Sequence, residues 1–73
     1  MNIYPNPANE SIKLDFEAKE ANVKLFNVSG DVVFSKDNVS QKVDIKVSDF
    51  EQGLYFLIIE NKKFFATDQL IIE

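Results

Sequence analysis

The sequence predicts an all-β fold, an immunoglobulin-like antiparallel β-sandwich of about six or seven short strands. Two observations support this prediction. Short segments rich in β-branched and aromatic residues recur roughly every 8–12 residues and are separated by polar turns. The connections between these segments are too short for the crossovers that parallel strands need. At 73 residues, the chain is expected to form one small domain over residues 1–73.

The apolar run at residues 54–59 is expected to form the central strand. It reads Leu-Tyr-Phe-Leu-Ile-Ile and follows Gly53. The run is far shorter than the roughly 20 apolar residues of a membrane span. Its length and its aromatic and β-branched composition favour a strand over a helix. Because both alternating faces are apolar, we expect both of them to be covered.

The first half of the chain predicts an edge segment, a strand and a hairpin. Pro5 and Pro7 fix φ and remove two donors, so residues 3–9 form an edge segment or a rigid turn. Residues 11–16 alternate between apolar and polar side chains, as a half-buried strand does. Residues 23–28 and 32–35 flank a turn that contains Gly30, which predicts a β-hairpin.

The second half predicts two further strands around the central run. Residues 36–40 are polar and are expected to form a turn, and residues 42–47 alternate as a strand does. Residues 48–51 have the S-x-x-E form of a capping box, which predicts one tight turn with Phe50 packed under the sheet. Residues 61–63 form a polar turn into the last segment, which ends in an apolar strand.

Composition argues against catalysis, cofactors, metals and nucleic acid. The chain has no Cys and no His, so neither Ser–His nor Cys–His nucleophile systems can form, and we expect no enzyme. The acidic residues lie in turns and on polar faces, match no calcium loop, and are expected to be solvated. The two glycines form no phosphate loop. A net charge of −4 without any Arg disfavours nucleic acid as a partner.

Two features allow more than one interpretation. Tyr4 and Tyr55 could form a platform on which a sugar stacks, but Tyr55 lies in the most apolar run, which favours a place in the core with its hydroxyl at the rim. The apolar end of the chain could pair within the sheet. It could also offer its backbone edge to a receptor by strand addition. The sequence is compatible with both roles together.

Four motifs, taken in order and with their spacing, resemble the C-terminal sorting domain of cargo proteins of the type IX secretion system of Bacteroidota. The resemblance covers residues 3–73. The family often has a basic residue beside the terminal apolar run, where this chain has Asp68, Gln69 and Glu73. The motifs are Tyr4-Pro5-Asn6-Pro7, the segment Leu-Phe-Asn-Val-Ser-Gly ending at Gly30, Gly53-Leu54-Tyr55-Phe56, and the terminal Leu70-Ile71-Ile72.

The resemblance implies a domain at the C-terminus of a larger secreted protein, joined to an N-terminal cargo domain. Such a domain directs its cargo from the periplasm across the outer membrane, to the cell surface or the medium, and a sortase-like protease usually removes it. The implied partners are the outer-membrane translocon and the shuttle and sortase-like components. The first residues form no signal peptide, so we expect a larger parent from which this domain is excised.

The resemblance also implies which residues matter. The implied recognition residues are Leu70, Ile71, Ile72 and Glu73 at the chain end, with Gly53, Leu54 and Tyr55. The implied motif and turn residues are Tyr4, Pro5, Asn6, Pro7 and Gly30. Two other functions stay open from the sequence: a small β-sandwich module that binds carbohydrate or a surface, and a non-catalytic spacer of a larger secreted enzyme.

Overall fold

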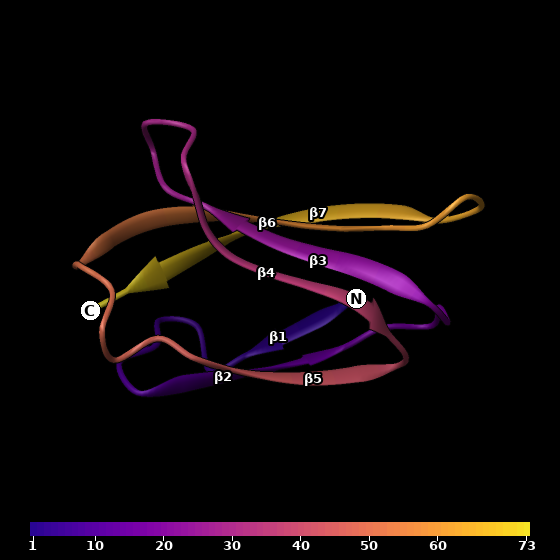
Figure 1. The fold of residues 1–73 in the computed structure, drawn as a ribbon. Coiled ribbons are helices and arrows are strands. Elements are labelled where there is room, and N and C mark those ends of the chain that lie inside the picture. Colours follow the sequence, from indigo (N-terminus) through magenta and orange to yellow (C-terminus); the bar gives the residue numbers. More distant parts are fainter.

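The computed structural model describes all residues from Met1 to Glu73 and contains seven strands (Figure 1). Every strand pair is antiparallel, which confirms the predicted all-β antiparallel sandwich. No helix that could span a membrane is found. The strands are β1 (Asn2–Tyr4), β2 (Ser11–Asp15), β3 (Ala21–Phe26), β4 (Val32–Val39), β5 (Lys42–Lys46), β6 (Gly53–Glu60) and β7 (Phe65–Ile72).

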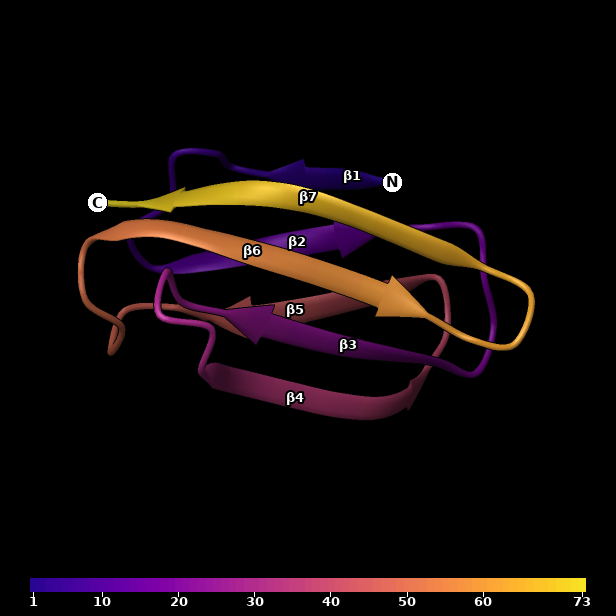
Figure 2. The same cartoon turned by 90° about the horizontal axis from the view of Figure 1, so that it is seen from above.

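The strands form two sheets that face each other across one core. One sheet has the order β1-β2-β5 and the other the order β4-β3-β6-β7. Seen from above, the four-stranded sheet lies across the three-stranded one, with β7 and β1 toward the same side (Figure 2). The core contains 17 buried residues, none of them polar. The most completely buried large side chains are those of Ile12, Leu14, Leu25, Ile45, Leu57, Ile59 and Leu70.

The alternating segments behave as their sequences predict. In β2, Ile12 and Leu14 point into the core while Lys13 is exposed. In β5, Val43 and Ile45 are buried and the charged residues between them face water. Because β2 and β5 pair directly with each other, their apolar side chains form one continuous inner face.

The strand β6 is central, as predicted, but only one of its faces is buried. It pairs with β3 on one side and with β7 on the other. Tyr55, Leu57 and Ile59 face the core, whereas Leu54, Phe56 and Ile58 are half-buried on the outer face. The expectation that both faces are covered was therefore wrong. The sandwich has only two layers, and neighbours within the sheet shield the outer side chains.

The structure corrects the prediction for the hairpin that β3 and β4 form. β3 ends at Phe26, and β4 runs on to Val39, so residues 36–40 are not simply a turn. The pairing of β3 with β4 contains register shifts, and Asn38 adopts a positive φ of 58°. Most of β4 is exposed on both faces, so its side chains carry no alternation that could reveal a strand.

The turn before β6 forms as predicted. The backbone N–H of Phe50 donates to the Val47 carbonyl at 3.0 Å, closing one tight turn. The half-buried Phe50 ring stacks on Tyr55, with 6.1 Å between ring centroids. Gly53 then starts β6 with a φ of +145°, a conformation that favours glycine.

We predict that the two faces of β6 differ in what they contribute to stability. Leu57→Ala leaves a cavity in the closed core and is expected to lower the free energy of unfolding by about 2–5 kcal/mol. Leu54→Ala removes atoms from the half-exposed outer face and is expected to cost about 1 kcal/mol or less. Urea unfolding of both variants measures the difference. Equal losses would contradict the assignment of the two faces.

Candidate functional site

The N-terminal motif and the end of the final strand are joined by hydrogen bonds. The Asn6 side chain accepts from the Ile71 backbone N–H at 3.0 Å and donates to the Gln69 carbonyl at 3.1 Å. The Ala8 backbone donates to the Ile71 carbonyl at 2.9 Å and accepts from the Glu73 N–H at 2.7 Å. We call these four bonds, made by Asn6 and Ala8 to the end of β7, the Asn6–Ala8 clamp.

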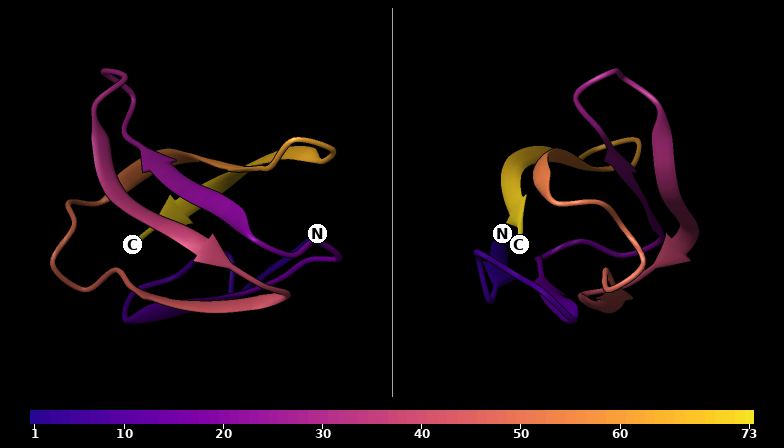
Figure 3. Two further views of the ribbon diagram at one scale, coloured as in Figure 1. Left: turned by 45° about the vertical axis from the view of Figure 1, so that its right-hand side comes forward. Right: turned by 90° about the vertical axis from the view of Figure 1, so that its left-hand side faces the viewer.

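The prolines around Asn6 explain why this segment lies beside β7 without being a regular strand. Pro5 and Pro7 have fixed φ angles and no N–H, so neither can contribute a donor to a sheet. The Asn6 side chain supplies the missing bonds, and Ala8 forms a short parallel bridge with Ile72. Both chain ends therefore lie along one side of the sandwich, as the right-hand view of Figure 3 shows.

The clamp closes half of the outer edge of β7. One side of β7 pairs with β6 along its whole length, from Ile72 opposite Gly53 to Phe65 opposite Glu60. On the other side, the clamp engages Gln69, Ile71 and Glu73, and the Asp68 carboxylate accepts from the Gln69 N–H at 2.8 Å. The C-terminal half of the edge is thus occupied in the folded domain. The first residues of β7 lie outside the clamp.

The structure brings most of the implied recognition residues together. The register pairs Gly53 with Ile72, Leu54 with Ile71, and Tyr55 with Leu70. Leu70 and Ile72 are buried in the core, at 0% and 2% exposure, while Ile71 is 41% exposed on the outer face. Glu73 is exposed at the chain end.

The two tyrosines, Tyr4 and Tyr55, lie in different sheets and differ in burial. Tyr55 is buried, and its hydroxyl donates to the Glu51 carbonyl at 2.7 Å, which confirms a core position with the hydroxyl at the rim. Tyr4 is exposed on β1, in the other sheet, and donates to the Asp15 carboxylate at 2.9 Å. This hydrogen bond is the main reason that the pKa of Tyr4 is raised above its usual value. The two rings form no shared platform.

The hairpin tip between β3 and β4 is organised by Asn27. Its side-chain oxygen accepts from the N–H groups of Ser29 and Asp31, each at 3.0 Å, and its carbonyl accepts from Gly30. Gly30 has a φ of +87°, which explains why a glycine is suited to the motif. The second motif includes Asn27, but only Gly30 was named from the sequence as a turn residue, although an Asn shortly before a turn glycine is a known signal. Ala8, which carries no such signal, was also missed.

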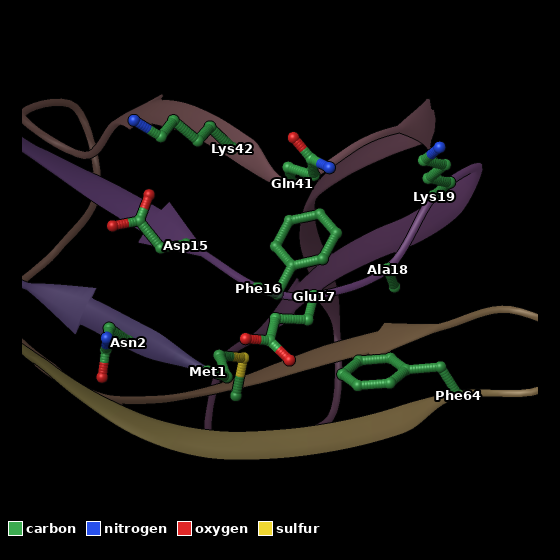
Figure 4. A pocket seen from close by; sticks show the side chains of 10 residues that line it. All are labelled: Met1, Asn2, Asp15, Phe16, Glu17, Ala18, Lys19, Gln41, Lys42 and Phe64. Atoms are coloured by element: carbon green, nitrogen blue, oxygen red, sulfur yellow. The ribbon is translucent and has the colours of Figure 1, made fainter.

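An open groove of about 730 Å³ lies between the start of β1 and the residues just before β7 (Figure 4). Met1, Phe16 and Phe64 form its apolar part, and charged side chains of both signs surround them. No group of three or more potential metal-ligating side chains is found in the structure. The groove therefore offers a place for apolar contact beside charged side chains.

A model of the secretion system C-terminal sorting domain matches residues 2–73 of the chain. The chain belongs to this family. Among solved structures, the sorting domain is similar to part of PorZ, described as an essential bacterial surface component of the type IX secretion system of Porphyromonas gingivalis. The TM-score is 0.85 at 14% identity, over 99% of this chain and 11% of that one, so the likeness shows the fold. No curated protein matches the chain.

The family assignment confirms the resemblance drawn from the four motifs. In this sorting domain, the first motif supplies Asn6 to the clamp, the second forms the Asn27 turn, and the third and fourth pair as β6 and β7. Three of the four motifs therefore meet at the final strand, although they lie far apart in the sequence.

We predict that Asn6→Ala loosens the end of the chain. Losing two bonds to the backbone of β7 is expected to lower the free energy of unfolding by about 1 kcal/mol and to let residues 71–73 fray. Digestion by carboxypeptidase should then remove the last residues faster than in the parent domain.

Asn61→Ala is the matched control for this prediction. The Asn61 side chain also makes two bonds to backbone groups, the Lys19 carbonyl and the Lys63 N–H, but at the opposite end of β7. The control should lose similar stability and keep the digestion rate of the parent. If both variants are digested equally fast, the clamp is not what holds the chain end.

Proposed function

We propose that this domain is the secretion signal of a cargo protein joined to its N-terminus. The signal directs the cargo through the outer-membrane type IX translocon to the cell surface or the medium, and a sortase-like protease then removes it. The family match over residues 2–73 carries this proposal. The partners are the translocon, the shuttle and the sortase-like protease, and we propose no nucleic acid, metal or catalytic activity.

The burial pattern at the chain end supports two different roles for the proposed recognition residues. Leu70 and Ile72 are packed in the core, so a partner that meets the folded domain cannot touch them. Ile71 and Glu73 are accessible, and Ile71 continues the apolar outer face through its neighbour Leu54. Ile71 and Glu73 then contact the secretion machinery, while Leu70 and Ile72 hold the strand in place.

The cargo would join the chain at Met1, which is exposed. Met1 and Glu73 lie on one side of the sandwich but toward opposite ends of it (Figures 1 and 3). A cargo domain at Met1 therefore leaves the end of β7 open to a partner. The alternative of a carbohydrate-binding module has less support, because the buried Tyr55 cannot stack on a sugar beside Tyr4.

Export of a fluorescent reporter fused to the N-terminus of this domain tests the proposal in a type IX-competent host. The reporter should reach the medium or the cell surface with the parent domain. Ile71→Lys should reduce its export about tenfold, the effect of losing roughly 1.4 kcal/mol of binding. Val32→Lys is the control, because Val32 is 50% exposed on β4, which β3 and β6 separate from β7, and it should be exported as the parent is.

Thermal melting of each purified domain checks that the variants are folded. A reporter that stays in the periplasm with the folded parent domain would overturn the proposed sorting function. Equal export of the Ile71→Lys variant and the parent would instead remove Ile71 from the recognition surface.

A further inference from the structure

The first part of β7 has an edge with unpaired backbone groups. The backbone groups of Gln69 and Ile71 point away from β6, toward the clamp. Because these directions alternate along a strand, the N–H and carbonyl groups of Phe65 and Thr67 point to the same outer side. β7 is the last strand of its sheet, and the backbone bonds outside the strand ladders include neither residue. This edge is therefore open where the clamp does not reach.

The open edge lacks the features that normally prevent strand addition. Edge strands are usually protected by lysines, prolines, bulges or a covering segment. The edge strand β5 carries Lys42 and Lys46, and β4 has register shifts. By contrast, residues 65–67 are Phe-Ala-Thr, and Phe65 is 63% exposed. The next residue along the strand is Asp68, whose carboxylate is bonded to the Gln69 N–H, and Lys62 and Lys63 lie in the turn before Phe64.

The apolar groove lies beside this edge. Phe64, the residue before β7, lines it, and Figure 4 shows its ring directed toward Met1, with Phe16 and Ala18 above it in the view. A strand added next to β7 would direct alternate side chains toward the other sheet, where this groove lies. The edge therefore offers backbone bonds, and the groove offers a place for an apolar side chain, as strand-addition sites do.

We propose that an extended segment of a receiving secretion component adds as a further strand to β7 at Phe65 and Thr67 and places an apolar side chain in the Phe16–Phe64 groove. The added strand is short, because the clamp occupies the edge from Gln69 onward. This inference rests on the proposed sorting function and adds a second surface for the machinery, at the opposite end of β7 from Ile71 and Glu73.

A second copy of the domain fits this edge less well. Two copies pairing through β7 would share only the few residues before the clamp of each begins. Each copy also carries a net charge of −4, so the two domains repel one another. A segment of another protein pairs over the same few residues, but it does not have to carry this negative charge.

Thr67→Pro tests the proposal in the reporter fusion. Proline removes the outward N–H of Thr67 and places its ring where an added strand would lie, and edge strands tolerate it there. Thr67→Val keeps the N–H and the β-branched shape and is the matched control. We expect export to fall at least about tenfold with Thr67→Pro and to stay at the parent level with Thr67→Val.

Each outcome separates this inference from the sorting function. A folded Thr67→Pro domain that is exported as well as the parent overturns the edge proposal, while parent export still supports the sorting function. Loss of export from the Thr67→Val variant, folded by thermal melting, also overturns it, because the N–H is then not what matters. A parent domain that is not exported overturns the sorting function itself.

A second measurement decides the question if Thr67→Pro does not fold. A photoreactive phenylalanine analogue replaces Phe65 in the fusion and, as a control, the exposed Val32 on β4. Light should cross-link position 65, but not position 32, to a component of the secretion machinery. Cross-links from position 65 solely to a second copy or to the attached cargo, or equal cross-linking from both positions, would overturn the proposal.

Discussion

The hydrogen bonds between the segment around Asn6 and the end of β7 tie the two sheets and the two chain ends together. β7 is an edge strand, so apart from the clamp it is held by its pairing with β6 and by the buried side chains of Leu70 and Ile72. Leu70 and Ile72 can stay in the core only while this strand is in place. In a domain of 73 residues, whose stability is necessarily modest, the few bonds of the clamp matter for the whole fold.

The same clamp determines how the end of the chain can be recognised. It uses the outward backbone groups of β7 from Gln69 to Glu73, so a partner meets side chains there and not an open backbone edge. The motifs of the family thus have a structural meaning in this chain. The proline motif protects the backbone of the terminal motif, and burial of Leu70 and Ile72 leaves Ile71 accessible.

The sequence was sufficient to predict the architecture but not the clamp. The sandwich was predicted from the alternation of apolar and polar residues in β2 and β5 and from the apolar run of β6. A strand with one buried face has an apolar residue at every second position, and this period is visible in the sequence. Much of β4 was missed because it is an edge strand exposed on both faces. The clamp joins Asn6 to Gln69 and Ile71, which lie 63 and 65 positions further along the sequence. The bonds of Ala8 use its backbone alone. No local sequence pattern therefore reveals the bonds of the clamp.

Residue-resolved amide hydrogen exchange of the 73-residue domain tests most directly the claim that the edge of β7 is half closed and half open. We predict slow exchange for the N–H groups of Ile71 and Glu73, which the clamp engages. Phe65 and Thr67 should exchange fast, while Ala66 between them stays protected by its pairing with β6. Equal exchange rates for the Thr67 and Ile71 N–H groups would show that the edge is not half closed and half open.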